Sequence, residues 1–209
     1  MDDFIVARTD GSPTYNFTAV ADDHDMGITH IIRGEDHISN TPKQIILYEA
    51  LGYDIPQFAH LPMILGADKR RLSKRHGAMG IQEFRDQGFL NSALVNYLAL
   101  LGWNSGTEQE LFSPEELIHE FSINRVQKKG AVWDNQKLEW INQQTILRME
   151  NDDILVHIRN INSQWGEKQP KETLLSIIEL MKPRSKTIVE LTDATDYFFH
   201  DPTAVSYTH

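Results

Sequence analysis

Two apolar β-rich runs separated by one helical run constrain the fold of this chain more than any other feature. The first run, Ile28 to Ile32, is β-branched and almost entirely apolar, which is typical of a strand buried on both faces. The second run extends from Phe58 to Leu65, although it contains Pro62. Because strand, helix and strand together span about 38 residues, the pattern predicts the βαβ unit of a parallel sheet.

Capping residues predict where the helices around these strands begin. Ser12-Pro13 places a good N-cap residue before a proline, and predicts a helix from about Pro13 to Asp25. Asn40-Thr41-Pro42 predicts the start of the helix between the strands, which runs to Leu51 before Gly52. Four residues on this second helix are expected at core spacing: Ile45, Ile46, Tyr48 and Leu51.

After Gly80 the pattern becomes helical and no further strand is predicted. The clearest start signal is Ser113-Pro114-Glu115-Glu116, a capping box with proline at the first helical position. Helices are expected at about 81–87, 89–101, 114–121, 135–149, 153–163, 171–181 and 186–199. The fold class that follows from the residues is therefore α/β followed by all-α, in one or two domains.

Composition excludes several classes of protein. A net charge of -10 and a pI near 5.3 argue against broad coating of nucleic acid, so any such contact has to be local. The chain has no Cys, which excludes disulfides and Cys-ligated zinc and fits a reducing compartment. No apolar run approaches the roughly 18 residues of a membrane span, and the N-terminus lacks the basic start of a secretory signal, so a cytoplasmic location is expected.

No metal site is expected from the sequence. Asp22-Asp23-His24 and His30 are the candidates, but Asp22 and Asp23 point to different faces of their helix, and the spacing fits no zinc pattern.

A basic segment, Lys69 to His76, follows the second predicted strand. It holds five Lys or Arg side chains in eight residues of an otherwise acidic protein. A solvated basic turn is one interpretation. The segment is nearly free of carboxylates, however, and Leu72-Ser73 adds an anchor and a hydroxyl donor. Since lysine offers a phosphate a point charge and arginine a planar fork, the mixture favours a polyphosphate site.

A second polar cluster, Arg33 to His37, follows the first predicted strand. Ligands of parallel sheets bind at the carboxyl ends of the strands, so we expect this cluster and the basic segment on the same rim. One interpretation is a surface turn with internal ion pairs. The other is a site for a zwitterion, in which Arg33 holds a carboxylate and Asp36 an ammonium group. Tyr15, taken alone, is expected to be a partly buried packing residue.

Taken together, these segments resemble the bacterial-type glutamyl-tRNA synthetases, a family of class I aminoacyl-tRNA synthetases. The run from Arg71 to Arg75, Arg-Leu-Ser-Lys-Arg, is similar to the second signature of that class, Lys-Met-Ser-Lys-Ser, in the form that glutamyl enzymes use. Further similar segments are 10–17, 27–42, 58–60, 96–103 and 131–134 with Lys137-Leu138. The likeness extends from about residue 4 to residue 150 and more weakly beyond.

The resemblance implies ATP-dependent activation of glutamate to glutamyl-adenylate and transfer of the glutamyl group to the 3′ end of tRNA(Glu). Lys74 would stabilise the transition state at the α-phosphate of ATP, which enters as its Mg²⁺ complex; no zinc is implied. The implied ATP site comprises Leu65, Arg71, Leu72, Ser73, Lys74 and Arg75. The implied glutamate pocket comprises Tyr15, Arg33, Asp36 and His37, with Arg33 on the side-chain carboxylate.

The resemblance also implies three regions. Residues 1–80 correspond to the second half of a Rossmann-like catalytic domain, residues 81–150 to a helical stem-contact region, and residues 151–209 to the start of a helical anticodon-binding domain. The full-length enzyme is expected to be a cytoplasmic monomer that binds no membrane and has tRNA(Glu), glutamate and ATP as partners.

One departure is the first class signature, His-Ile-Gly-His, which has no counterpart here. The chain is therefore expected to be an internal fragment with negligible aminoacylation activity of its own. Two alternatives stay open: a tRNA-binding fragment without catalysis, and the paralogue that attaches glutamate to queuosine in tRNA, against which the helices after residue 150 count. A glutaminyl enzyme is disfavoured because its C-terminal region is β-barrel.

Overall fold

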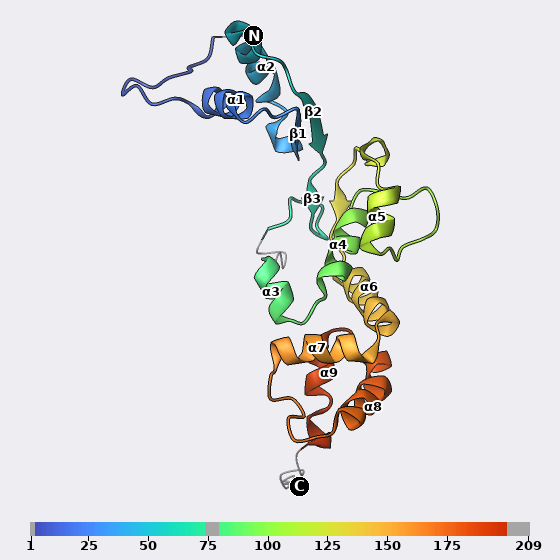
Figure 1. Ribbon diagram of the computed structural model, residues 1–209. Coiled ribbons are helices and arrows are strands. Elements are labelled where there is room, and N and C mark those ends of the chain that lie inside the picture. The colour runs from blue at the N-terminus through green and yellow to red at the C-terminus, as the bar shows by residue number, and fades with distance from the viewer. Residues whose placement is uncertain (1–2, 74–79, 200–209) are drawn as a thin grey trace. The chain divides into compact units, whose positions relative to one another are not determined.

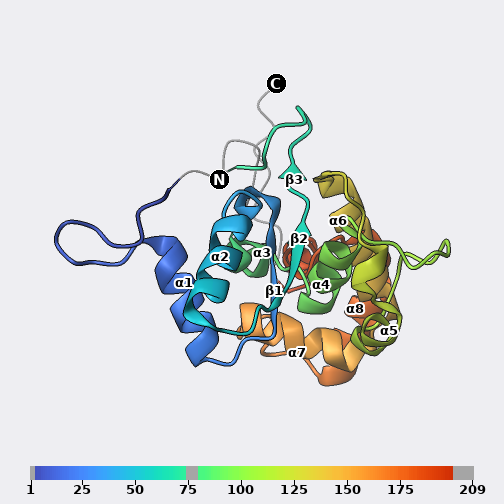
Figure 2. The ribbon, with the colours of Figure 1, turned by 90° about the horizontal axis from the view of Figure 1, so that it is seen from above.

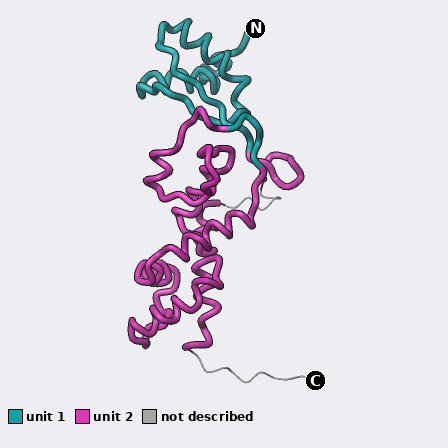
Figure 3. The backbone as a smooth tube through the Cα atoms, turned by 90° about the vertical axis from the view of Figure 1, so that its right-hand side faces the viewer, with its two compact units in different colours: residues 1–63, 127–131 teal, residues 64–126, 132–209 magenta. Residues whose placement is uncertain are grey.

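The computed structural model describes residues 3–73 and 80–199, which form helices and short strands. Two compact units divide the chain (Figure 3). The first comprises residues 1–63 and 127–131, and the second comprises residues 64–126 and 132–209. Each unit is described by itself below.

The first unit contains the predicted βαβ arrangement. Strand β1 (His30–Gly34) and strand β2 (Gln57–Leu61) pair in parallel, and helix α2 (Thr41–Leu51) connects them. Helix α1 (Tyr15–Asp25) lies beside α2 (Figures 1 and 2). In the register of the pair, Arg33 is opposite His60. This pairing confirms the parallel sheet that the two apolar runs predict.

The core of the first unit differs from the predicted one. Val20 of α1 packs with Leu47 and Tyr48 of α2, and all three side chains are buried. Ile46 and Leu51, which were expected in the core, are 40% and 39% exposed. The prediction was wrong for these two because α2 turns its face with Gln44, Leu47 and Tyr48 inward, at the i, i+3, i+4 spacing of one helix face.

Strand β1 is also less buried than its composition predicts. Ile32 is 55% exposed, so the expectation of a strand buried on both faces is wrong for the described residues. Side chains alternate along a strand, which places Ile32 on the face opposite to Ile31 and Arg33.

The start of α1 corrects a second prediction. The helix begins at Tyr15, after Thr14, and not at Pro13. Pro13 instead pairs with Ala7 in an antiparallel bridge, and the Ser12 hydroxyl donates to Asp10 Oδ1 at 2.6 Å. Ser12 therefore belongs to a turn before the helix, in which Asp10 Oδ1 accepts from both the N–H and the hydroxyl of Ser12.

The second apolar run forms two strands and not one. Strand β2 ends at Leu61, and β3 (Ile64–Leu65) begins after Pro62 and Met63. The interruption has a simple cause, since proline has no N–H to donate to a sheet. β3 lies in the second unit and pairs with β4 (Ala131–Val132), a strand that was not predicted after Gly80.

Helices make up most of the second unit. They follow the predicted ranges closely, and the last predicted helix is the main exception: it is shorter and continues as a 3-10 turn at Asp196–Phe198. The helices are α3 (Ile81–Asp86), α4 (Asn91–Leu100), α5 (Pro114–Glu120), α6 (Asn135–Arg148), α7 (Asn151–Ile161), α8 (Lys171–Met181) and α9 (Ile188–Asp193).

The capping box that predicts α5 is present in the structure. The Glu116 N–H donates to Ser113 Oγ at 3.1 Å, and the Ser113 N–H donates to Glu116 Oε2 at 2.7 Å. Both orphan donors at this helix start are thereby satisfied.

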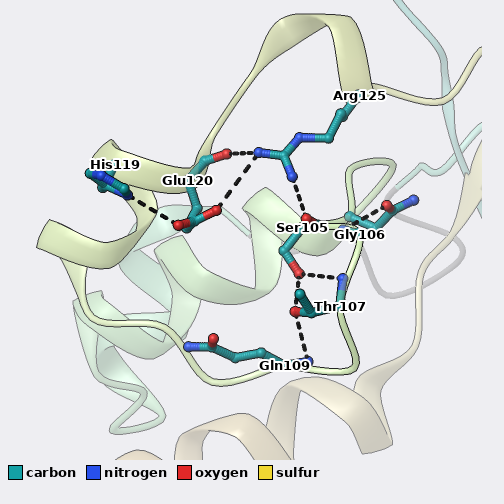
Figure 4. Close-up of polar contacts among 8 residues, drawn as sticks. Ser105, Gly106, Thr107, Gln109, His119, Glu120 and Arg125 are labelled. Atoms are coloured by element: carbon teal, nitrogen blue, oxygen red, sulfur yellow. Dashed lines mark hydrogen bonds and ion pairs between the residues drawn. The ribbon is translucent and has the colours of Figure 1, made fainter.

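Arg125 forms hydrogen bonds with the end of α5 and with the loop that precedes α5 (Figure 4). Its guanidinium donates to the carbonyl oxygens of Ser105 and Glu120, and lies 3.8 Å from the Glu120 carboxylate. The same group lies 5.5 Å from the centre of the Trp103 ring. One arginine thus connects the end of α5 to the loop around Ser105.

In the part of the chain that the structure describes, no helix combines the length and the apolar character that a membrane span requires.

The boundaries of the two compact units differ from those of the three regions implied by the family resemblance. The boundary at residue 63 precedes the basic segment, whereas the implied boundaries lie near residues 80 and 150. The three regions stay a prediction.

A buried amide on α6 gives a test of the helical core. Asn142 is fully buried, accepts from the Leu90 N–H at 2.8 Å and donates to the Lys186 carbonyl at 2.6 Å. Asn142→Ala leaves two backbone groups without partners, and we expect it to lower the unfolding free energy by about 2–4 kcal/mol in urea titrations. Gln136→Ala, an exposed amide on the same helix, is the control and should change it by less than about 0.5 kcal/mol. Equal effects of the two substitutions would contradict the role of Asn142.

Candidate functional site

Arg33 stands at the carboxyl end of β1, where α2 begins. Its Nη2 donates to Thr41 Oγ1 at 2.8 Å and to Gln44 Oε1 at 2.7 Å. Gln44 is 2% exposed, and the Phe58 ring lies 5.4 Å from the guanidinium carbon. These contacts hold the guanidinium plane in one orientation, because two acceptors of one helix and one aromatic face fix it from different sides.

The charge of Arg33 has no carboxylate partner among the described residues. None of their acidic side chains lies within ion-pair distance of it. Its Nε is buried and makes no hydrogen bond. Arg33 is half-buried, and a charge that is partly removed from water is usually paired with an opposite charge. The arrangement therefore suits the binding of an anionic group by the guanidinium.

Tyr15 and His37 lie next to each other. The Tyr15 hydroxyl is 3.3 Å from His37 Nδ1, and the two ring centres are 5.9 Å apart. Tyr15 is 54% exposed, so the expectation of a partly buried packing residue is wrong. The cause is its position at the first residue of α1, before the helix reaches the core at Val20. An exposed phenol beside an imidazole offers a polar edge to a ligand.

Gly34 ends β1 and lies close to the Asp36 side chain. A Cβ on Gly34 would lie 2.5 Å from Asp36 Oδ1, closer than real Cβ atoms approach. Asp36 itself is exposed and has an interaction within the chain. Glu35 turns the other way, and its Oε1 accepts from the Met63 N–H at 3.0 Å. The cluster therefore contains one acid that fixes the backbone after β2 and a second, Asp36, that is accessible.

His60 belongs to this site and was missed by the sequence reasoning. Its Nε2 lies 2.9 Å from Thr41 Oγ1, the hydroxyl that also accepts from Arg33. Burial, followed by the positive charges of Arg33 and His37, holds the pKa of His60 below its ordinary value. One signal could have pointed to His60, because neighbouring parallel strands end at the same edge and His60 lies near the end of its strand as Arg33 does. Thr41 and Gln44 lie on α2, and this signal does not reach them.

The described part of the basic segment is the end of a hairpin. Leu65 and Arg71 form an antiparallel bridge, the Gly66 N–H donates to the Arg70 carbonyl, and the Leu72 N–H donates to the Ile64 carbonyl, both at 2.8 Å. We call residues 64–73 the lysine hairpin. Among non-glycine residues described, Lys69 alone has a positive φ, of 61°, at the tip of its turn.

Charges at the tip of the lysine hairpin are exposed. Arg70 lies 3.9 Å from Asp68, but their side chains are 85% and 43% exposed, so this pair adds little stability. Arg71 and Ser73 are exposed and each has an interaction within the chain, whereas Leu65 and Leu72 are half-buried.

Two predicted residues, Lys74 and Arg75, lie outside the described residues. The cluster around Arg33 falls in the first unit and the lysine hairpin in the second. The expectation that the two share one rim stays a prediction.

Within residues 3–73 and 80–199, no group of three or more His, Asp or Glu side chains has an arrangement that would hold a metal ion.

Comparison with known proteins shows a family match over most of the chain. Residues 1–140 match the family described as tRNA synthetases class I (E and Q), catalytic domain, where E and Q denote glutamate and glutamine. A protein of Syntrophus aciditrophicus named glutamate--tRNA ligase 1 is 48% identical over 206 residues, which are 98% of this chain and 43% of that protein. The glutamate--tRNA ligase of Nitrosomonas europaea is 51% identical over 201 residues, which are 95% of this chain and 43% of that protein.

Solved structures give the same result. The glutamate tRNA ligase of Elizabethkingia meningosepticum, crystallised in complex with its amino acid, superposes with a TM-score of 0.87 and 35% identity over 99% of this chain and 45% of its own. The glutamate-tRNA synthetase of Elizabethkingia anophelis superposes with a TM-score of 0.84. The chain spans less than half the length of the relatives it matches.

The environment of His60 predicts a pH dependence. Because its pKa is lowered in the folded state, the unfolded chain binds the proton more readily when the pH falls below the ordinary value of 6.5. We expect the unfolding free energy to be highest above pH 6.5. It should fall as the pH drops from 6.5 towards the folded-state pKa. Urea titrations at several pH values measure this dependence in the wild type and in His60→Gln. The unfolding free energy should change less with pH in the variant.

NMR titration of the His60 ring is the direct test. The pKa should lie below 6.5 in the wild type and should rise in Arg33→Gln without reaching 6.5, since burial is its largest cause. A wild-type value at or above 6.5 would contradict the geometry described for Thr41 and His60.

Proposed function

The chain belongs to the class I tRNA synthetases for glutamate and glutamine, and we propose that it forms part of a glutamate–tRNA ligase. In the proposed reaction a carboxylate oxygen of glutamate attacks the α-phosphorus of ATP, and pyrophosphate leaves. The 3′-terminal ribose of tRNA(Glu) then takes the glutamyl group, and AMP leaves. The glutamate–tRNA ligases of Syntrophus aciditrophicus and Nitrosomonas europaea match the chain beyond residue 150 as well, which favours the ligase over the queuosine-modifying paralogue.

The observation that carries this proposal is the fixed guanidinium of Arg33. Its orientation is set by Thr41 and Gln44, its Nε is buried without an acceptor, and no described carboxylate neutralises it. A ligand with a carboxylate at the end of a flexible side chain would supply the missing negative charge and accept hydrogen bonds from the guanidinium. Glutamate has such a group, which leaves its α-carboxylate for reaction with ATP.

The remaining residues of the proposed glutamate pocket surround Arg33. Asp36 would hold the ammonium group, and the edge formed by Tyr15 and His37 would bound the site. His60, whose lowered pKa favours the neutral ring, would keep a second positive charge away from Arg33 without competing for the carboxylate.

The proposed ATP site is the basic segment. Lys74 would stabilise the charge that develops on the α-phosphate, and Leu65, Arg71, Leu72, Ser73 and Arg75 would shape the loop around it. Mg²⁺ would enter with ATP as part of the substrate, and zinc has no role in the proposal. The exposed side chains at the hairpin tip support it, because phosphate groups can reach them.

The finer organisation is proposed by analogy with the family. Residues 1–80 would complete a Rossmann-like catalytic domain, residues 81–150 would contact the acceptor stem of tRNA, and residues 151–209 would begin a helical anticodon-binding domain. The complete enzyme would act as a monomer in the cytoplasm.

A chimera tests the proposed function. This chain replaces the matching 201 residues of the Nitrosomonas europaea ligase, which keeps its own flanking segments. We expect the chimera to catalyse ATP–pyrophosphate exchange with glutamate and not with aspartate, because the four proposed pocket residues come from this chain. A chimera that unfolds cooperatively and still shows no glutamate-dependent exchange would contradict the proposal.

Substitution of Arg33 tests its role in the pocket. In the chimera, Arg33→Gln should lower kcat/KM for glutamate roughly hundredfold, since a charge-assisted hydrogen bond is lost. Arg159→Gln removes an exposed guanidinium of α7 and is the matched control, with unchanged kinetics expected. An Arg33→Gln enzyme with the wild-type KM for glutamate would exclude the assigned contact.

Substitution of Lys74 tests the phosphate site. Lys74→Ala in the chimera should cost about 3 kcal/mol of transition-state stabilisation, roughly a hundredfold in the rate of adenylate formation. Lys168→Ala, an exposed lysine between α7 and α8, should leave the rate unchanged. Near-normal adenylate formation by Lys74→Ala would remove this residue from the mechanism.

A further inference from the structure

Among the described residues, β3 connects the lysine hairpin to the segment that precedes α6. β3 lies between the returning arm of the hairpin, which bonds to it through the Leu72 N–H, and Trp133, whose N–H donates to the Leu65 carbonyl at 2.8 Å. A shift of Trp133 would therefore move β3, and with it the arm that leads to Ser73.

Trp133 is held in place by aromatic rings of two helices. Its ring stands edge to face against Tyr97 of α4, with centres 4.9 Å apart, and lies 5.8 Å from Phe84 of α3. Its Nε1 donates to Asn135 Oδ1 at 2.6 Å. Edge-to-face contacts of this kind fix orientation as well as burying surface.

The next peptide connects the same segment to α4 by a hydrogen bond. The Asp134 N–H donates to the Tyr97 hydroxyl oxygen at 2.7 Å, and Tyr97 is only 2% exposed. Asp134 has extended backbone angles, and successive N–H groups of extended backbone point to opposite sides. The N–H of residue 133 therefore binds the hairpin while the N–H of residue 134 binds the helix.

The charge state of Tyr97 suits this role. Burial raises the pKa of its phenol and favours the neutral form, whose oxygen accepts the Asp134 N–H. Asp134 also caps α6, because its Oδ1 accepts from the Lys137 N–H at 3.1 Å. One short segment is thus fixed to α4, to α6 and to β3 at the same time.

We propose that Tyr97 is a positioning residue for the lysine hairpin: its hydroxyl fixes the Trp133-Asp134 segment, which in turn fixes β3. The inference rests on the proposed function in one respect, namely that the hairpin carries Lys74 to the phosphates of ATP. Tyr97 touches no substrate in this assignment. Its effect on the reaction passes through the backbone of Asp134, Trp133 and Leu65.

Hydrogen exchange in this chain tests whether the Tyr97 hydroxyl stabilises the lysine hairpin, and it needs no assay of activity. Tyr97→Phe removes one oxygen and keeps the ring. The amides of Gly66, Leu72 and Trp133 should then exchange roughly tenfold faster or more, while amides within α8 keep their rates. Tyr197→Phe, which removes a hydroxyl from a 63% exposed ring of the same unit, is the matched control and should change none of them. Unchanged exchange at Gly66 and Leu72, or equal acceleration within α8, would overturn the proposal.

Kinetics of the chimera test the functional part. Tyr97→Phe should lower kcat for glutamate-dependent pyrophosphate exchange at least roughly fivefold and leave KM for glutamate unchanged, because the pocket around Arg33 is not involved. Accelerated exchange at Leu72 with an unchanged kcat would overturn the positioning role. A chimera that is inactive before any substitution would contradict the proposed function instead, and the hydrogen-exchange result would then decide the coupling between Tyr97 and the hairpin by itself.

Discussion

The parallel pairing of β1 with β2 is the constraint on which the candidate amino acid site depends. It sets Arg33 opposite His60, and the connecting helix α2 begins at the same edge, so that Thr41 lies within hydrogen-bond distance of both. A shift of one residue in this register would turn either side chain to the other face of the sheet. The site is thus a consequence of backbone pairing, and its chemistry follows from which residues the register brings together.

A second constraint is the proline that divides the apolar run after β2. Since Pro62 cannot donate to a sheet, the chain leaves the pairing with β1 and starts a new one with β4 two residues later. This change of partner places the lysine hairpin in the helical unit. The hairpin is therefore supported by aromatic side chains of helices, whereas Arg33 is supported by a sheet and the helix that crosses it.

Much of the fold could be predicted because its signals are local. The strand–helix–strand order, the capping box at Ser113 and the ranges of α4, α6 and α8 follow from short-range pattern and turn chemistry. The wrong predictions depend on contacts made elsewhere in the chain. Ile46 and Leu51 are exposed because α1 selects another face of α2, and β4 exists only because β3 lies beside it. For the same reason Arg33 was found from its position after a strand, but Gln44, which depends on how α2 packs, was not.

Lys69 combines an unfavourable backbone conformation with a positive charge at the tip of the lysine hairpin. A φ of 61° is a conformation that glycine adopts freely and that costs an L-residue about 1–2 kcal/mol. A glycine at the tip would fold more easily, yet it would remove a cation from the segment. The chain thus has a charged residue at a position where backbone energetics alone would select against it. Directed evolution for thermal stability alone would therefore tend to exchange this lysine for glycine or asparagine, whereas selection for the phosphate binding proposed above would retain it.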